Sequence, residues 1–216
     1  PIPGGIVSPK GKLIYIIALV IGIGIPISII YLLNLLRFRI EGHTDVEKLT
    51  TVPIIGDIPL TDAGKNGTPT IAVRENDNNI MAETFRSLRT NLLFIMGDPD
   101  KKVILVTSTI SGEGKTFMAS NLAVSLALLG KKVILVGLDI RKPGLNKIFH
   151  LSHKEKGITQ YLAAPQSTDL HALIQPSGIT SNLDLLLGGP IPPNPTELLA
   201  RQSLEDTIST LRKEYD

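Results

Sequence analysis

The loop "STISGEGKT", residues 108–116, has the residue types and spacing that phosphate binding requires. Glycines at 112 and 114 let backbone N–H groups turn inward around phosphate oxygens, and a helix that starts after the loop adds a partial positive charge. Lys115 can then reach the β- and γ-phosphates of a nucleotide, and the Thr116 hydroxyl can hold Mg²⁺. The loop therefore predicts a P-loop, although Thr109 stands where the usual pattern begins with glycine. The alternative is a flexible turn that merely precedes a helix.

A second cluster lies in "ILVGLDIRKP", residues 134–143, where an apolar run ends in Gly137, Leu138 and Asp139. In α/β folds the carboxyl end of a parallel strand is where ligand-binding groups are placed. Strand alternation directs residues 137 and 139 to the same side, so each could face a metal ion. Asp139 is therefore predicted to serve Mg²⁺. The alternative is that Asp139 only caps a turn together with Arg141.

The elements that position these clusters are those of an α/β domain. "KKVILVTS" at 101–108 and "KKVILVGL" at 131–138 are short apolar runs typical of buried parallel strands, and the helical stretch 115–130 separates them. "NLDLLL" at 182–187 predicts a third strand. A helix is expected from Asn194, with that residue as N-cap, Pro195 at the first position and Glu197 at the third. Another helix is expected from Asn79, with an apolar stripe formed by Ile80, Phe85, Leu88, Leu92 and Ile95.

The N-terminal part has a different character. Residues 13–36 contain no charge and as a helix would extend about 36 Å, enough to cross a hydrocarbon core of about 30 Å. A signal peptide and a buried core helix are the alternatives. Residues 1–12 are rich in proline and glycine, and residues 37–78 are expected to form a linker that contains at most one short strand, at 52–59. Basic residues flank both ends of the apolar stretch, so charge does not orient it.

Composition excludes several classes of protein. The formal net charge of +2 does not favour nucleic-acid binding, and the absence of cysteine rules out disulfides and thiolate metal sites. His150 and His153 could share a helix face, but without a third ligand they are better interpreted as a surface pair. The chain starts without methionine and ends within a charged run, so we expect it to be a piece of a longer protein.

The P-loop resembles the Walker A motif of bacterial tyrosine kinases, usually S-x-x-P-G-E-G-K-[ST]. Ser111 replaces the proline and Glu113 is kept. Residues 110 and 111 are Ile and Ser, whereas partitioning ATPases of the ParA/MinD type place a signature lysine there. The apolar run before Asp139 resembles the Walker A′ motif of the same kinases, three apolar residues followed by D-x-D-x-R. Asp139 and Arg141 match its second aspartate and its arginine, and Gly137 occupies the place of the first aspartate.

Two further stretches carry the same resemblance. "AETFRSLRTNLLF" contains Glu83, Arg86 and Arg89 in an E-x-x-R-x-x-R motif, which forms the subunit contact of a ring in this family. The alternative is an intrahelical Glu–Arg pair worth a few tenths of a kcal/mol. "GGPIPPNPTELL" resembles the family's G-x-x-P-P-N-P-x-E-L-L segment. The proline-rich run before the apolar stretch resembles the polysaccharide co-polymerase, or chain-length-determinant, part of these proteins.

The resemblance implies a P-loop NTPase-like α/β fold with a parallel sheet, present in part and preceded by one transmembrane helix. It divides the chain into a periplasmic juxtamembrane segment (1–12), a membrane helix (13–36), a cytoplasmic linker (37–78) and the first part of a kinase domain (79–216). A Walker B strand is expected beyond Asp216, so this piece alone is expected to be inactive. ATP and Mg²⁺ are the implied cofactors, and the bacterial inner membrane is the implied location.

By the same resemblance the protein is a membrane-bound tyrosine autokinase that regulates capsular or exopolysaccharide polymerisation and export. Its implied partners are further copies of itself in a ring, the membrane and the polysaccharide machinery. The implied catalytic residues are Lys115, Asp139 and Arg141, with Thr116 and Asp139 at the metal. The implied nucleotide-binding residues are Ser111, Gly112, Glu113, Gly114, Lys115, Thr116 and Phe117. The alternatives are a membrane-tethered ATPase that acts as an assembly switch, and a chain-length scaffold whose nucleotide site is only regulatory.

Overall fold

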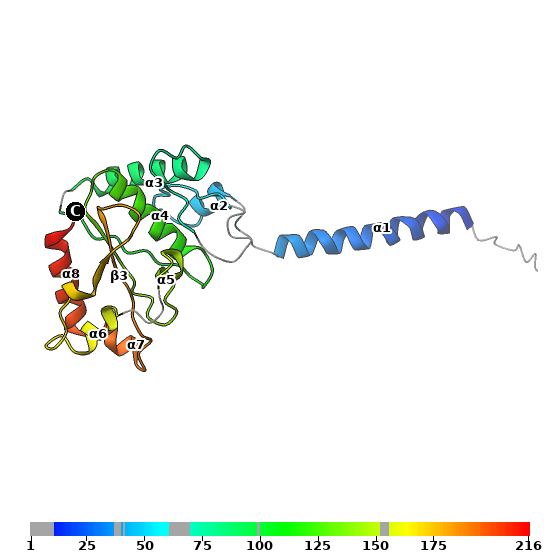
Figure 1. Ribbon diagram of the computed structural model, residues 1–216. Helices are drawn as coiled ribbons and strands as arrows, with labels where there is room; N and C mark the ends of the chain where they lie inside the picture. Colours follow the sequence, from blue (N-terminus) through cyan, green and yellow to red (C-terminus); the bar gives the residue numbers. More distant parts are fainter. Residues whose placement is uncertain (1–10, 37–39, 41, 61–69, 99, 152–155) are drawn as a thin grey trace, which may run out of the picture. The chain divides into compact units, whose positions relative to one another are not determined.

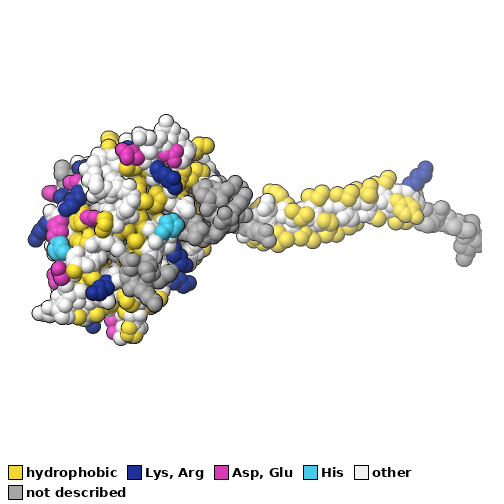
Figure 2. All heavy atoms as spheres, viewed as in Figure 1, with side chains coloured by type: hydrophobic (Ala, Val, Ile, Leu, Met, Phe, Trp, Pro, Cys, Tyr) yellow, Lys and Arg dark blue, Asp and Glu magenta, His cyan; other side chains and the backbone are white. Residues whose placement is uncertain are grey.

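The computed structural model describes residues 11–36, 40, 42–60, 70–98, 100–151 and 156–216. The chain divides into two compact units, residues 1–54 and 55–216 (Figure 1). The first unit contains helices α1 (Gly11–Leu36) and α2 (His43–Glu47). The α1 helix is long and apolar enough to be a candidate membrane span, a test that a signal sequence near the N-terminus also passes. Apolar side chains predominate on the face of this helix seen in Figure 2, and none of its residues is buried. Pro26 lies inside the helix.

The second unit is a three-layer α/β structure. Its sheet has the strand order β1-β3-β2, in which β1 and β3 are parallel and β2 is antiparallel to β3. The sheet is therefore mixed rather than purely parallel. The strands are β1 (Val133–Val136), β2 (Ile174–Pro176) and β3 (Leu183–Leu186).

Helices cover both faces of this sheet, and the alternation of side chains along β3 shows how. Leu183, Leu185 and Leu187 join one apolar core with α3 (Ile80–Met96), α4 (Lys115–Leu128) and α5 (Leu145–Ile148). Leu186 points to the other core, which is formed with α6 (Ile158–Ala163), α7 (Pro195–Leu199) and α8 (Gln202–Glu214). A short 3₁₀ turn, η2 (His171–Leu173), precedes β2. Because successive strand residues face opposite sides, one strand can serve two cores.

Helix α3 starts where the sequence predicts it to start, but its apolar face is rotated. The Asn79 side chain accepts a hydrogen bond from the Ala82 N–H at 2.8 Å, which is N-cap geometry. Ile80 and Ile95 are exposed, and the buried residues of this helix are Met81, Ala82, Phe85 and Leu88. A stripe of apolar residues thus located the helix correctly but misassigned two of its buried positions.

Residues 55–58 and 71–73 are part of the second unit and pack in its core region, although the sequence predicts them within a linker. Ile55, Ile58, Ile71 and Val73 all contact the core that contains α3 and α4. Asn121 of α4 holds the second of these stretches, since its Oδ1 accepts the N–H groups of Ala72 at 2.7 Å and Val73 at 3.1 Å. The stretch 52–59, a candidate strand by sequence, forms no strand.

The expected strand at 101–108 is not formed. Val103, Ile104 and Leu105 are exposed instead, Leu105 to 80 %. A cavity of about 1070 Å³ lies between this stretch and β1, so no strand among the described residues offers it a hydrogen-bond ladder. An apolar run needs such a partner to become a strand. Of the predicted strand–helix–strand unit, the structure therefore contains the helix and the second strand but not the first strand.

The single helix expected from Asn194 is two helices, α7 and α8, interrupted at residues 200–201. Asn194 is the N-cap position of α7 and Pro195 follows at its start, as expected. The Asn194 side chain makes no capping bond; its Nδ2 donates to Glu197 Oε2 at 3.1 Å instead.

Candidate nucleotide-binding site

The P-loop is shaped by two glycines with left-handed backbone angles. Gly112 has φ 98° and Gly114 has φ 87°, a region that residues with a Cβ rarely adopt. Gly114 is also the N-cap of α4. Its carbonyl accepts a hydrogen bond from the Met118 N–H at 2.8 Å, which connects the loop to the helix. The loop thus ends directly at a helix N-terminus, where free N–H groups and the helix dipole favour an anion.

Glu113 stabilises the loop from within. Its Oε2 accepts the backbone N–H groups of Thr109 at 2.9 Å and Ile110 at 3.1 Å. These bonds fold the start of the loop onto its middle, at the position where the usual pattern has its first glycine. The Glu113 carboxylate thus binds the loop backbone, and the expectation that Glu113 takes part in nucleotide binding stays a prediction.

Lys115 and Asp139 meet although 24 residues separate them in the chain. The Lys115 ammonium nitrogen lies 3.1 Å from Asp139 Oδ2, and Asp139 Oδ1 accepts the Lys142 N–H at 3.1 Å. The carboxylate therefore caps its turn and also faces the P-loop lysine. Its role at Mg²⁺ stays a prediction. An ion pair this exposed contributes little stability, so it matters mainly because it places the two charged groups side by side.

The charge state of Asp139 follows from these contacts. Partial burial acts to raise the pKa of Asp139, but the Lys142 N–H, the Lys115 ammonium and the Arg141 N–H together outweigh it and hold the pKa below its usual range. The carboxylate is consequently ionised at neutral pH and available to a cation. The turn after it also approaches the P-loop, since a Cβ at Gly144 would lie 3.4 Å from Thr116 Oγ1.

Magnesium suits this donor set only together with a nucleotide. The described residues contain no group of three acidic or histidine side chains that could hold a metal ion. Thr116 and Asp139 line the same cavity and supply one hydroxyl and one carboxylate to it. Mg²⁺ is commonly held by one or two carboxylates plus substrate phosphates, so these two residues fit a nucleotide-bound ion rather than an independent metal site.

Gly137 lies at a backbone crossing. A Cβ at this position would lie 3.1 Å from both Gly188 N and Leu145 Cδ1, tighter than ordinary contacts. Gly157 and Gly189 are closer still, since a Cβ on Gly157 would lie 2.4 Å from Gly189 N. Four glycines thus let the ends of β1 and β3 and the start of α6 pack backbone to backbone. Local sequence patterns do not predict this crossing, because its glycines lie 20 or more residues from one another, except for the neighbours 188 and 189.

Three further residues of the predicted site have side chains that make other contacts or do not face the Lys115–Asp139 contact. Arg141 donates to Thr196 Oγ1 at 3.0 Å, which connects the turn after Asp139 with α7. The Phe117 ring packs edge-on against Phe85 at 5.9 Å between centroids, so its side chain belongs to the core and only its backbone is near the loop. Ser111 is exposed in the loop.

The three residues expected at a subunit interface make contacts within the chain. Arg86 forms an ion pair with Glu83 and donates to the Asp77 carbonyl. Arg89 donates to the Ser125 carbonyl at 2.8 Å, which ties α3 to α4. Arg89 is thus already engaged by the fold of one chain, whereas the Glu83–Arg86 pair stays at the surface.

Residues 104–216 match the family model described as "CobQ/CobB/MinD/ParA nucleotide binding domain". The match covers more than half of the chain and includes the P-loop, Asp139 and the sheet. The chain therefore belongs to this family of nucleotide-binding domains, and the P-loop NTPase-like fold predicted from the sequence is confirmed.

Within that family the chain is similar to bacterial tyrosine kinases, as its motifs predicted. It is 29% identical to a "Putative tyrosine-protein kinase EpsB" of Ralstonia solanacearum over 100% of its own length and 29% of that protein's. It is 38% identical to "Tyrosine-protein kinase YwqD" of Bacillus subtilis over 64% of the chain and 56% of that protein. The "BceF Tyrosine Kinase Domain" superposes with a TM-score of 0.70 and 31% identity, covering 82% of this chain and 73% of the other. The chain thus spans under a third of the length of EpsB.

Proposed function

We propose that this chain is part of a protein-tyrosine autokinase that transfers the ATP γ-phosphoryl group to tyrosines of neighbouring subunits. The observation that carries the proposal is the 3.1 Å contact between Lys115 and Asp139, which joins a P-loop to the carboxylate of a second motif. Relatives named tyrosine-protein kinases support the reaction class. One of them, from Klebsiella pneumoniae, is named for its place "in cps region", which supports a role in capsular or exopolysaccharide polymerisation and export.

The residues of the site have different roles in phosphoryl transfer. The backbone N–H groups of the loop and the start of α4 bind phosphate oxygens, and the Lys115 ammonium neutralises charge on the transferred group. Thr116 and Asp139 would hold Mg²⁺, which when bound neutralises the phosphates further. Entry of a nucleotide would require Lys115 to exchange part of its contact with Asp139 for a phosphate. Arg141 acts through the position of α7 rather than at the phosphate.

Gly137 leaves the site with one carboxylate fewer than the related motif has. Phosphoryl transfer through a loose transition state depends more on positioning and charge stabilisation than on a general base. We therefore infer a slower or differently arranged kinase rather than an inactive one.

Incubation of the longer protein with ATP tests the reaction class. Phosphotyrosine on the protein, absent in a Lys115→Ala variant, is the expected result. Release of inorganic phosphate without protein labelling would instead favour an ATPase that acts as an assembly switch. Polymer length that survives Lys115→Ala in cells would favour a scaffold with a merely regulatory nucleotide site.

Location and orientation follow from the proposed substrate. ATP is cytoplasmic, so residues that follow α1 are placed in the cytoplasm and residues 1–12 on the periplasmic side of the inner membrane. The candidate span α1 supports membrane attachment. A protease added outside spheroplasts should leave the P-loop region intact; cleavage there would contradict this orientation.

Self-association through α3 can be tested with the surface pair on that helix. Arg86→Glu alone places two acids side by side, whereas the double change Glu83→Arg with Arg86→Glu restores an intrahelical pair. If the helix contacts a neighbouring subunit, both variants stay dissociated in light scattering. If the pair is only intrahelical, the double variant assembles normally. Arg89 is left unchanged because its bond to Ser125 belongs to the monomer fold.

A further inference from the structure

The backbone N–H groups of the P-loop fall into two sets. Thr109 and Ile110 donate theirs to Glu113 Oε2, at 2.9 Å and 3.1 Å. The N–H groups of residues 111–117 donate to no acceptor among the residues that the structure describes. The start of the loop is therefore anchored by the loop's own carboxylate, and the N–H groups that follow are available to an anion.

The anchored start is the part of the loop that lacks glycine, because Thr109 stands where the usual pattern has one. The left-handed backbone angles come later, at Gly112 and Gly114. Side chains hold the start instead. Ser108 Oγ donates to the Ile110 carbonyl at 3.0 Å, so both backbone polar groups of Ile110 are bound by side chains of the loop.

We propose that Glu113 is a positioning residue of the P-loop, whose carboxylate stays on the Thr109 and Ile110 N–H groups while ATP occupies the N–H groups that follow. Glu113 stands between two glycines, the residues that lose most conformational freedom when a chain is ordered. Its two hydrogen bonds order the loop before the nucleotide arrives, so less ordering is required on binding. The inference deepens the proposed function and rests on it for the identity of the nucleotide.

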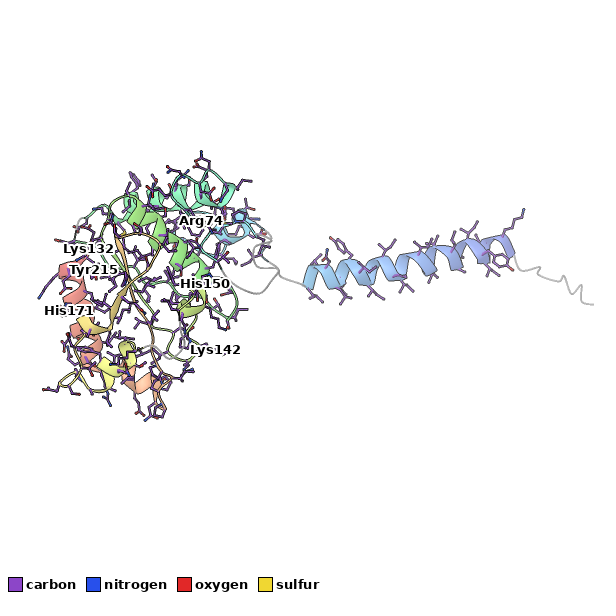
Figure 3. The ribbon with its side chains drawn as sticks, viewed as in Figure 1. Arg74, Lys132, Lys142, His150, His171 and Tyr215 are labelled. Carbon is purple, nitrogen blue, oxygen red and sulfur yellow. The ribbon has the colours of Figure 1, made fainter. Side chains whose placement is uncertain are left out.

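The charge of this anchor has a second effect, because a carboxylate beside a phosphate site repels the ligand. Lys115 opposes this repulsion from within the loop. The turn after Asp139 adds the exposed side chains of Arg141 and Lys142, the latter labelled in Figure 3. The hydrogen bonds of Glu113 thus favour phosphate binding and its charge disfavours it. Glutamine separates the two effects, since its amide oxygen can accept both N–H groups without the charge.

Calorimetry of ATP binding to the longer protein tests the proposal. Glu113→Ala should weaken binding about tenfold, because the anchor is lost. Glu113→Gln should bind ATP as tightly as the unchanged protein or up to about threefold more tightly, because the anchor remains and the repulsion is gone. Glu75→Ala, at an exposed glutamate in the turn before α3, is the control and should leave the affinity unchanged.

Three results would overturn the proposal. Tighter binding by both Glu113 variants would show that the carboxylate competes with phosphate. Equal weakening in both would show that its charge, not its hydrogen bonds, serves the nucleotide. Unchanged binding in both would show that the anchor has no influence. Steady-state kinetics gives a further readout, since Glu113→Ala should raise KM for ATP about tenfold with kcat altered by less than about twofold.

Amide hydrogen exchange shows whether the carboxylate stays in place when ATP binds. The Thr109 and Ile110 amides should exchange at least about tenfold more slowly in the unchanged protein and in Glu113→Gln than in Glu113→Ala, with and without ATP. Loss of this protection on addition of ATP to the unchanged protein would mean that the carboxylate is displaced, which contradicts the proposal.

The outcomes separate this inference from the proposed function. Phosphotyrosine formation by a protein whose two Glu113 variants bind ATP like the unchanged protein would reject the anchor and keep the kinase. The expected order of affinities in a protein that forms no phosphotyrosine would keep the anchor and reject the kinase. An unchanged protein that binds no ATP would reject both.

Discussion

The hexapeptide Lys-Lys-Val-Ile-Leu-Val occurs twice, at 101–106 and at 131–136, and the two copies adopt different structures. The second copy contains β1, paired with β3 and partly buried. The first is not a strand, and its Val103 and Leu105 are exposed to 56% and 80%. Intrinsic strand propensity is the same in both copies, so it cannot account for the difference.

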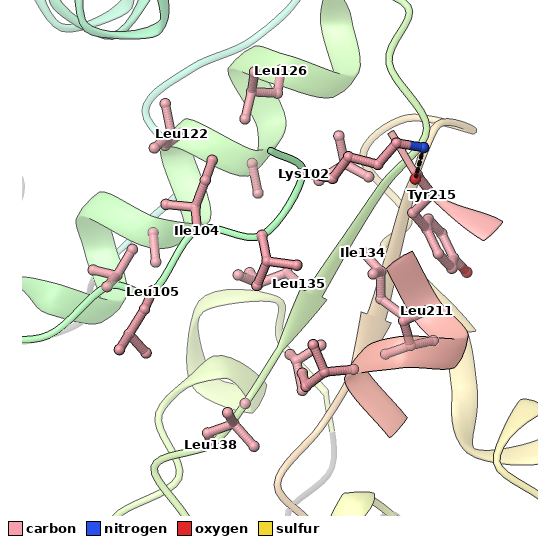
Figure 4. A pocket seen from close by; sticks show the side chains of 18 of the residues that line it. Lys102, Ile104, Leu105, Leu122, Leu126, Ile134, Leu135, Leu138, Leu211 and Tyr215 are labelled. Carbon is pink, nitrogen blue, oxygen red and sulfur yellow. Dashed lines mark hydrogen bonds between the residues drawn. The ribbon is translucent and has the colours of Figure 1, made fainter. Parts of the chain in front are cut away.

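The difference lies in what surrounds each copy. β1 has β3 along one edge, whereas residues 101–107 face a cavity of about 1070 Å³ (Figure 4). Strand formation is largely the formation of cross-strand bonds and contacts, and local sequence supplies only a weak preference. Both copies nevertheless lead into the same site, since the first is followed by the P-loop and the second by Asp139.

The largest expected effect comes from breaking the loop that follows the first copy. Lys115→Ala in the longer protein should weaken ATP binding by at least about a hundredfold, because a charged phosphate ligand is lost. Isothermal calorimetry measures the affinity. Lys101→Ala is the control, because Lys101 is an exposed lysine in the first copy of the hexapeptide. Near-normal affinity of Lys115→Ala would show that the loop does not bind phosphate.

The residue that follows each copy offers a second test, since Thr107 follows the first and Gly137 the second. Gly137→Ala should lower the free energy of unfolding by about 1–3 kcal/mol, because the new methyl group meets Gly188 and Leu145 at 3.1 Å. Gly42→Ala is the matched control, as no atom lies within 4 Å of a Cβ there. Equal denaturant midpoints for the two variants would mean that the crossing at Gly137 relaxes freely.

The substitution Asp139→Asn tests the loop that follows the second copy of the hexapeptide. This change keeps the shape of the side chain but removes the charge that faces Lys115. We expect autophosphorylation of the longer protein to fall at least about tenfold, or about 1.4 kcal/mol of barrier, with ATP binding weakened much less. Asp206→Asn on the exposed face of α8 is the control. An unchanged rate would leave Asp139 with its turn-capping bond alone.

The smallest effect concerns α8, the helix that brings Tyr215 and Asp216 to the cavity beside β1. Hydrogen bonding to Glu214, its negative charge and that of Asp169 raise the pKa of His171. A raised pKa in the folded state means that the stabilisation is complete below the unfolded pKa of about 6.5 and is lost as pH rises through the folded value. The charged pair is exposed, so the change is small.

Urea midpoints of the protein and of His171→Gln, compared at pH 5.5 and pH 8.5, isolate this contribution. The unchanged protein should gain slightly more stability at the lower pH than the variant does. A pH dependence that is identical in both proteins would show that the contact between His171 and Glu214 contributes nothing to the attachment of α8.

The sequence alone determined the class of protein and the positions of its two motifs. Gly112, Gly114, Lys115 and Thr116 act at fixed spacing on a single loop, and the structure gives that loop the left-handed glycines and helix start that the pattern predicts. The kinase family followed from several motifs together. Patterns of this kind can be predicted because their geometry depends on neighbours along the chain.

Only the tertiary structure decided which residues meet across the chain. It brought Asp139 to Lys115, took Arg141 to Thr196 and Arg89 to Ser125, and explained Gly137 through its crossing with Gly188. It also separated two identical hexapeptides into a strand and an unpaired edge. These outcomes depend on packing and hydrogen bonding between segments distant in sequence, and a stretch of residues carries no record of the partner that it will meet.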